Sequence, residues 1–456
     1  MSDISALKNR KPIYLILLIG IIISIFYANF NLKVFDKNEN NNHLMIRGDT
    51  NLIWYEAETF KKDLINNKNF FGNGSEYMRT FLPSKLIAFY SLITGYDLYE
   101  DFTTDKKSTN GKLLYLLFQI LFYYLSLLFL YERLLDFYND KKISLYIISF
   151  LALDLNILQW HGTFWTESIF FSLQIIFIAM LLKENKSIYF SLLLGFLIGV
   201  MCLQKTIALM FIFFVMIYLI FSEKNFMLKI LSIFFSFFVV LTLLGYDNYK
   251  KTGIFYVLPS NYNNAHYSVL IPQIYVKNKL NISELKNLEE KWKQDNNFSE
   301  ESFQSQYDFR IFKKKKAIEI MLDNKLTTIK IYLKNSIHHA VLNPAQTYFW
   351  HKYNQLRYRF IEFHLSLEEK KYFKYRIIYS LIFYLVVLAG LYEAFINNKS
   401  LKLMKFHILI IFLIFYSVFM LGWVGNSRYF MPSVIFLSIY FGHGVKYLSK
   451  IRTLKI

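Results

Sequence analysis

Residues 206–245 read TIALMFIFFVMIYLIFSEKNFMLKILSIFFSFFVVLTLLG, two apolar runs separated by the short polar stretch 223–225. Each run has about the length that a helix needs to cross the hydrocarbon of a bilayer, because a helix rises about 1.5 Å per residue. The connection carries Lys224, and Lys229 follows it. These residues therefore predict two adjacent membrane spans joined by a basic loop, a pattern that recurs in the rest of the chain.

The same kind of apolar run recurs along the whole chain of 456 residues, 55% of which are hydrophobic. The 47 Phe suit lipid-facing helix surfaces, and the 35 Tyr suit the membrane–water interface. The sequence predicts an all-α integral membrane protein with about ten transmembrane helices. The expected spans are 13–30, 113–131, 143–160, 167–182, 188–204, 206–222, 227–245, 373–395, 406–423 and 431–448. No small-residue cleavage site follows the first run, which predicts an uncleaved span rather than a signal peptide.

The basic residues predict the orientation of these spans. The formal net charge is +19, but Lys and Arg cluster in short loops between apolar runs, so we expect them to set topology rather than to bind nucleic acid. With the N-terminus inside, every inner connection is basic, whereas the short outer ones hold only Lys205 and Arg428. We therefore predict a multi-pass protein of the cell (inner or plasma) membrane with both termini cytoplasmic.

Two long segments, 31–112 and 246–372, then fall on the outer side. They divide the chain into an N-terminal membrane module (1–245), an extracytoplasmic segment (246–372) and C-terminal membrane helices (373–456). The first long loop contains the short apolar stretch 82–92, which is typical of an interfacial or re-entrant helix. In the second, the lysine run 313–316 is either a solvated face or a contact with anionic headgroups.

Charged residues gather on the predicted outer side. Charges near a bilayer are costly, so those that occur there are candidates for function. Structural roles are also available to them: Asp49 could cap a helix, Glu167 could interact favourably with the dipole at a helix N-terminus, and Arg428 could anchor the chain at the membrane interface. Their convergence from both ends of the chain predicts one outward-facing site. Its candidate members are Asp49, Glu56, Glu58, Asp154, Glu167, Lys205 and Arg428.

Several short motifs occur in an order that resembles the GT-C glycosyltransferases, which include dolichyl-phosphate-mannose protein mannosyltransferases and bacterial aminoarabinose transferases. Residues 47–50 (RGDT) and 77–83 (YMRTFLP) resemble the first extracytoplasmic loop of that group. Residues 152–156 (ALDLN) with 164–168 (FWTES) resemble the junction of its third and fourth spans. Further similar positions are 204–206 (QKT), 247–249 (DNY) with Gly253, and Arg428 with Pro432.

The resemblance implies a reaction in which an acceptor hydroxyl or amine attacks the anomeric carbon of a sugar carried on polyprenyl phosphate. Asp49 matches the catalytic aspartate of the group and would act as general base. Cations would stabilise the departing phosphate, with Arg79 the first candidate and Lys85, Lys205 and Arg428 further ones. The expected partners are the bilayer, the lipid-linked donor and a glycan, lipid or protein acceptor. A lipid-phosphate donor needs no cofactor, which agrees with the absence of a Gly-rich phosphate loop.

Other classes of site and function are less well matched. Adjacent residues such as His338 and His339 point about 100° apart on a helix, and Cys202 is the only cysteine, so we predict no metal site and no internal disulfide. An O-antigen-type polysaccharide polymerase is the first alternative, because it also combines many spans with a long outer loop. A lipid-linked glycan flippase or transporter is the second, although no internal repeat supports it.

Overall fold

A computed structural model describes residues 2–37, 49–67, 81–96, 106–164, 166–183, 187–223, 225–257, 266–299, 302–342, 367–397, 400–419 and 430–454. Every regular element in these ranges is a helix, and the chain is an all-α integral membrane protein. The membrane helices are α1 (Ser2–Lys37), α4 (Lys106–Tyr138), α5 (Lys141–Leu153), α6 (Leu155–Leu158), η1 (Gln159–Gly162), α7 (Glu167–Leu182), α8 (Ile188–Gln204), η2 (Thr206–Met210), α9 (Phe211–Ser222), α10 (Phe226–Thr252), α15 (Leu367–Tyr392), η7 (Glu393–Asn397), α16 (Leu401–Phe419) and α17 (Met431–Leu454).

In the described part of the chain, each of the ten predicted apolar runs lies on one to three of these helices. Within the described ranges, five stretches are long and apolar enough to cross a membrane: Lys11–Asn29, Asn110–Tyr138, Phe226–Lys250, Ile377–Ile396 and Leu401–Phe419. The pair α5 and α6–η1 would make a sixth span, bent by 46°. Three shorter apolar helices, Glu167–Leu182, Ile188–Gln204 and Thr206–Ser222, match the remaining predicted runs before residue 373, and α17 matches the last.

The remaining helices form two groups outside the bundle. The first is α2 (Asp49–Asn67) with α3 (Phe81–Thr94), which contains the short apolar stretch expected to be interfacial. The second comprises η4 (His266–Leu270), α11 (Ile271–Lys277), α12 (Ser283–Asp295), α13 (Phe303–Asp323) and α14 (Lys325–Leu342). Helix α10 continues beyond residue 245 and ends at Thr252, and Gly253 caps it with a left-handed φ of 73°.

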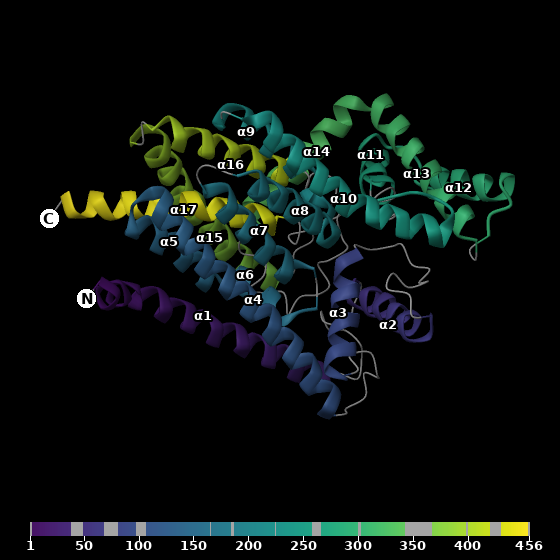
Figure 1. Ribbon diagram of the computed structural model, residues 1–456. Helices are drawn as coiled ribbons and strands as arrows, with labels where there is room; N and C mark the ends of the chain where they lie inside the picture. The colour runs from purple at the N-terminus through teal and green to yellow at the C-terminus, as the bar shows by residue number, and fades with distance from the viewer. Residues whose placement is uncertain are drawn as a thin grey trace.

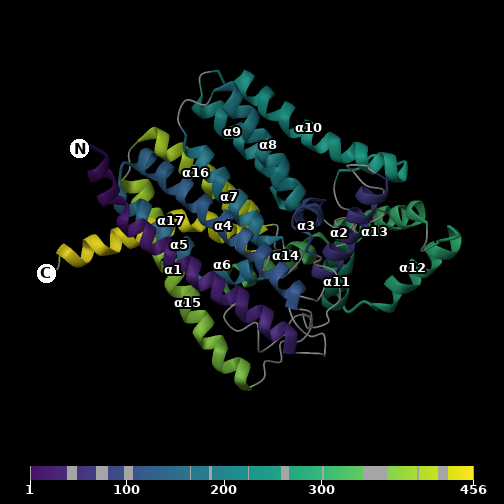
Figure 2. The same cartoon turned by 60° about the horizontal axis from the view of Figure 1, so that its bottom comes forward.

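The two groups lie at one end of the bundle, and the start of α1 and the end of α17 lie at the other (Figures 1 and 2). We call these the loop end and the terminal end. Helix α7 runs through the middle and is buried along its length apart from the half-buried Ile176. A helix that is apolar on all sides can lie in a protein core or in lipid, and the burial of α7 places it in the interior of the bundle. It packs against α4 and α8, and α17 packs against both α15 and α5.

Close backbone contact joins α15 to α17. A Cβ added at Gly390 would overlap the carbonyl oxygen of Tyr440, and one added at Gly444 would overlap that of Val386. Small residues at both helix surfaces allow this approach, which is the usual way in which membrane helices gain packing energy.

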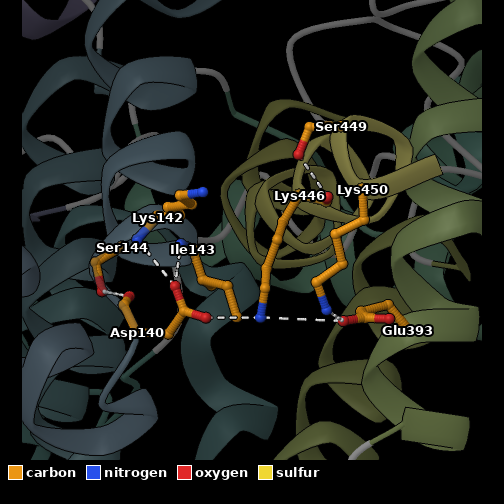
Figure 3. Close-up of polar contacts among 8 residues, drawn as sticks. All are labelled: Asp140, Lys142, Ile143, Ser144, Glu393, Lys446, Ser449 and Lys450. Carbon is orange, nitrogen blue, oxygen red and sulfur yellow. Dashed lines mark hydrogen bonds and ion pairs between the residues drawn. The ribbon is translucent and has the colours of Figure 1, made fainter. Parts of the chain in front are cut away.

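Charged side chains tie the terminal end together, as Figure 3 shows. The Nζ of Lys446 lies 2.6 Å from Asp140 at the α4–α5 turn and 4.0 Å from Glu393 of η7, which also accepts from Lys450 at 3.2 Å. Asp140 caps α5 by accepting from the backbone N–H of Lys142 at 2.9 Å. Burial alone would raise the pKa of Asp140, but its bonds to Lys446 and to backbone N–H groups hold that pKa below the usual value.

Candidate functional site at the loop end

The site begins where the third predicted span bends. Asp154 ends α5 and caps α6, and its carboxylate accepts from the backbone N–H and the side-chain amide of Asn156 at 3.0 and 2.9 Å. The hydroxyl of Tyr379 in α15 lies 3.4 Å from the same oxygen and 3.1 Å from the amide nitrogen of Asn156. Asp154 therefore turns the chain and fixes the bend to α15, which satisfies the polar groups exposed by a break in a membrane helix.

A buried ion pair closes the next junction. Glu167, the first residue of α7, is fully buried, and its Oε1 lies 2.8 Å from the Nζ of Lys205, which follows α8 and is 6% exposed. Thr166 donates to the other oxygen of Glu167 at 3.2 Å. Gln204 donates to the backbone oxygen of Thr166 at 2.9 Å. These bonds tie the start of α7 to the end of α8, so Lys205 is held by a carboxylate of the protein.

A histidine and a serine that the sequence did not associate lie beside this pair. The Nδ1 of His161 is 2.7 Å from the hydroxyl of Ser168, and both residues are fully buried. The ring of Tyr123 from α4 covers the imidazole, with 4.2 Å between ring centroids. The two partners are seven residues apart across a bend, so no helical or strand periodicity could have paired them.

Helix α2 packs onto the same junction. The ring of Trp54 meets that of Phe164 edge to face, with 5.2 Å between centroids, and the Nζ of Lys112 lies 5.6 Å from the Trp54 ring. Asp49 is the first residue of α2, about 7.5 Å along the helix axis from Trp54. The backbone of Asp49 is thereby placed near the loop end of the bundle.

Helices α2 and α3 hold the remaining described candidates. The Nζ of Lys85, in the buried face of α3, lies 3.0 Å from the ring centroid of Phe60 in α2. Glu56 is half-buried on α2. Glu58 instead forms an ion pair with Lys62 at 2.6 Å, in which the side chain of Glu58 is 40% exposed and that of Lys62 is 68% exposed. Among the candidates on these two helices, Lys85 and Glu56 are thus the inward-placed ones.

Among the described residues, the structure places one pair of predicted site residues in direct contact, Glu167 and Lys205. Asp154 lies on the same connection as Glu167, and α3, which carries Lys85, contacts α8. Arg79 and Arg428 lie outside the described residues, as does the side chain of Asp49. Within the described part of the chain, no group of three or more His, Cys, Asp or Glu is arranged to hold a metal ion. The side chains of His338 and His339 are not among those described.

No protein-family model and no curated protein matches the sequence. The structure is similar to that of an archaeal oligosaccharyltransferase, AglB from Archaeoglobus fulgidus, solved in complex with an inhibitory peptide and a dolichol-phosphate. The TM-score is 0.49 at 12% identity, covering 96% of this chain and 52% of that one. A structure of the Archaeoglobus fulgidus oligosaccharyltransferase in complex with Zn and sulfate gives a TM-score of 0.48 at 13% identity, covering 94% and 48%. The apo form of the same enzyme gives a TM-score of 0.48 at 13% identity, covering 96% of this chain and 52% of that one.

The chain thus spans about half the length of the solved structures that it matches. At this level of similarity neither the activity nor the ligands of those proteins transfer to this chain. Its function has to be inferred from the chemistry of its own residues.

Proposed function

We propose that the protein is a glycosyltransferase that moves a sugar from a polyprenyl-phosphate donor to an acceptor at the outer face of the membrane. The observation that carries the proposal is the packing of Trp54 against Phe164. This contact brings the helix that begins at Asp49 to the junction held by Glu167 and Lys205. In this proposal the acid from the first loop lies at the membrane surface, where the phosphate of a lipid-linked donor must lie. The loop end faces outward in this proposal, and both termini face the cytoplasm.

Asp49 serves as the general base of the proposed reaction. Its carboxylate takes a proton from the acceptor hydroxyl or amine as that atom forms a bond to the anomeric carbon. The bond between this carbon and the phosphate oxygen breaks, and the electron pair leaves with the lipid phosphate. The acceptor thus gains the sugar, and the donor becomes polyprenyl phosphate.

Cations stabilise the phosphate as it gains charge. Arg79 and Arg428 supply guanidinium groups, whose forked donors match phosphate oxygens. Lys85 adds a positive charge on α3, where the ring of Phe60 helps to hold it. Lys205 is a further candidate for contact with the phosphate, and its ammonium is also paired with Glu167 at 2.8 Å. In this proposal the pair positions the α7–α8 junction, and Asp154 positions the preceding bend.

Radiolabelled sugar on a short polyprenyl phosphate tests these roles. The purified protein is incubated with a panel of such donors, and free polyprenyl phosphate is measured for the native chain, Asp49→Asn and Arg79→Ala. Asp308→Asn is the matched control, because Asp308 is exposed on α13. We expect Asp49→Asn to lose at least about a hundredfold in rate, as removal of a general base does. An unchanged rate in Asp49→Asn would exclude Asp49 as the base and direct attention to Glu56 or Glu167.

Arg79→Ala is expected to raise the KM for the donor and to lower kcat, because the phosphate is charged before transfer and gains charge during it. A normal KM and kcat in this variant would remove Arg79 from the donor site. Release of polyprenyl phosphate coupled to joining of lipid-linked repeat units would favour the polymerase alternative. Movement of intact donor across vesicles without release would favour the flippase or transporter.

A further inference from the structure

Helices α13 and α14 form a hairpin around Asn324, and one face of this hairpin builds a small core. Ala317, Ile320 and Ile331 are buried there against α11 and η4. Asn324 accepts a hydrogen bond from the side-chain amide of Asn278 at 2.6 Å, which connects the turn to the end of α11. The hairpin is therefore a packed unit with a defined inner face.

The opposite face of the hairpin is also apolar, although it has no protein partner among the described residues. Its side chains recur at intervals of three or four residues, so on each helix they form one stripe. Leu326 is the most exposed, at 75%. An apolar stripe of this length is unusual on a surface that faces only water. The stripe consists of Ile318 and Leu322 on α13 and of Leu326, Ile329, Leu333 and Ile337 on α14.

Lysines border the stripe on both helices. Residues 311–337 contain seven lysines against one glutamate and one aspartate, a formal charge of +5. The exposed ones next to the stripe are Lys314, Lys315, Lys325, Lys330 and Lys334. An apolar stripe edged with lysines is typical of helices that lie in the plane of a membrane, because their long stems let the ammonium groups reach the headgroups.

The position of α14 places this stripe beside the bilayer. The ring of Tyr332 lies 4.7 Å from that of Phe419, the last residue of the span Leu401–Phe419. Further along α14, the carbonyl oxygen of Ala340 accepts a hydrogen bond from the hydroxyl of Tyr384, inside the span Ile377–Ile396. The C-terminal half of α14 therefore runs alongside two membrane helices, and its exposed stripe can meet the lipid that surrounds them.

We propose that the α13–α14 hairpin is a membrane-surface module that inserts its apolar stripe into the leaflet at the loop end and binds anionic lipid headgroups through its bordering lysines. The alternative occupant, a second copy of the chain, would match the apolar stripe. It would leave the positive charges of the two hairpins facing each other, which is unfavourable. The proposal does not depend on the reaction proposed above.

Site-specific fluorescence tests it, because Cys202 is the only cysteine and can be replaced by serine. Single cysteines at Leu326, Leu333 and Ile337 are labelled with an environment-sensitive dye, with Lys286, exposed on α12, as control. The protein is reconstituted in phosphatidylcholine vesicles with and without phosphatidylglycerol. We expect spin-labelled lipid to quench the three stripe positions, most strongly at Ile337, and iodide to quench only Lys286.

A charge variant tests the second half of the proposal. In Lys314→Gln/Lys315→Gln/Lys330→Gln/Lys334→Gln, the extra lipid quenching produced by phosphatidylglycerol should disappear, since each lysine near an anionic surface changes the docking equilibrium about fivefold. Quenching of the stripe by iodide but not by lipid would overturn the proposal. Protection that depends on protein concentration rather than on lipid would also overturn it, in favour of a second copy.

Discussion

Neutralising Glu167 should destabilise the protein far more than neutralising an exposed acid in an equally short ion pair. The Glu167–Lys205 pair has an N···O distance of 2.8 Å, and its side chains are 0% and 8% exposed. The Glu58–Lys62 pair is 2.6 Å long, but its side chains are 40% and 68% exposed. Since the distances are similar, burial is the main difference between the two pairs, although Thr166 also donates a hydrogen bond to Glu167.

The expected sizes follow from the dielectric around each pair. Glu167→Gln leaves the buried ammonium of Lys205 without the carboxylate that compensates it, a loss of about 3–5 kcal/mol in the free energy of unfolding. Glu58→Gln should change that free energy by at most about 1 kcal/mol, because water screens the exposed pair. In the double variant Glu167→Gln/Lys205→Met both charges of this pair are removed together, so most of the lost stability should return.

Equilibrium unfolding in mixed micelles measures the free energies of the native chain, Glu167→Gln, Lys205→Met and the double variant, which together form a double-mutant cycle. We predict a coupling energy between Glu167 and Lys205 of about 3 kcal/mol or more. Additivity of the two single substitutions to within about 0.5 kcal/mol would refute it, because independent sites behave in that way. Equal effects of Glu167→Gln and Glu58→Gln would refute the argument from burial.

Three further predictions concern other parts of the chain. Asp140→Asn keeps the cap of α5 but loses the charge facing Lys446, so it should lower the free energy of unfolding by about 1–2 kcal/mol. Because the pKa of Asp140 is lowered in the folded chain, this stability is present above the unfolded pKa of about 3.9 and is lost as the pH falls through the folded pKa. A pH series of unfolding midpoints should show this decline for the native chain and not for the variant. Burial, together with the positive charge of Lys314, lowers the pKa of His266 in the folded chain. The imidazole therefore binds a proton more tightly in the unfolded chain, and the protease resistance of the α11–α14 group should fall as the pH drops below about 6.5. His266→Gln should flatten this pH dependence. Gly390→Ala should lower the free energy of unfolding by about 1–3 kcal/mol, because the added Cβ overlaps the backbone of α17. Helix propensity alone would raise that free energy by up to about 1 kcal/mol. The sign of the measured change decides between overlap and propensity.

The apolar runs predicted the membrane helices well, because a span must be apolar over a fixed length whatever it packs against. The sequence predicted one span over residues 143–160, interrupted only by the charge of Asp154, but it did not predict the bend of 46° at that residue. Asp154 can end a helix there because Asn156 and Tyr379 satisfy its carboxylate, and Tyr379 is more than two hundred residues away in sequence. Periodicity contains no information about such a partner.

The sequence singled out candidate residues for a site but did not predict which of them contact one another. Glu167 and Lys205 were both singled out as charges on the outer side, but their contact depends on how α7 and α8 pack. His161 and Ser168 were given no role, although the fold places them together. The network of Asp140, Lys446 and Glu393 (Figure 3) was likewise hidden, since each residue appeared only as part of a charged loop or helix. Long-range polar contacts follow from the fold, which one sequence does not specify pair by pair.

Transfer from a lipid-linked donor is the central claim, and one measurement tests it most directly. Purified, folded protein is incubated with radiolabelled sugars carried on a short polyprenyl phosphate, and free polyprenyl phosphate and sugar-bearing product are counted together. The account predicts that at least one donor is consumed, with polyprenyl phosphate and product formed in equal amounts. Donors that all remain intact in the presence of a broad set of acceptors, with the protein shown to be folded, would contradict it.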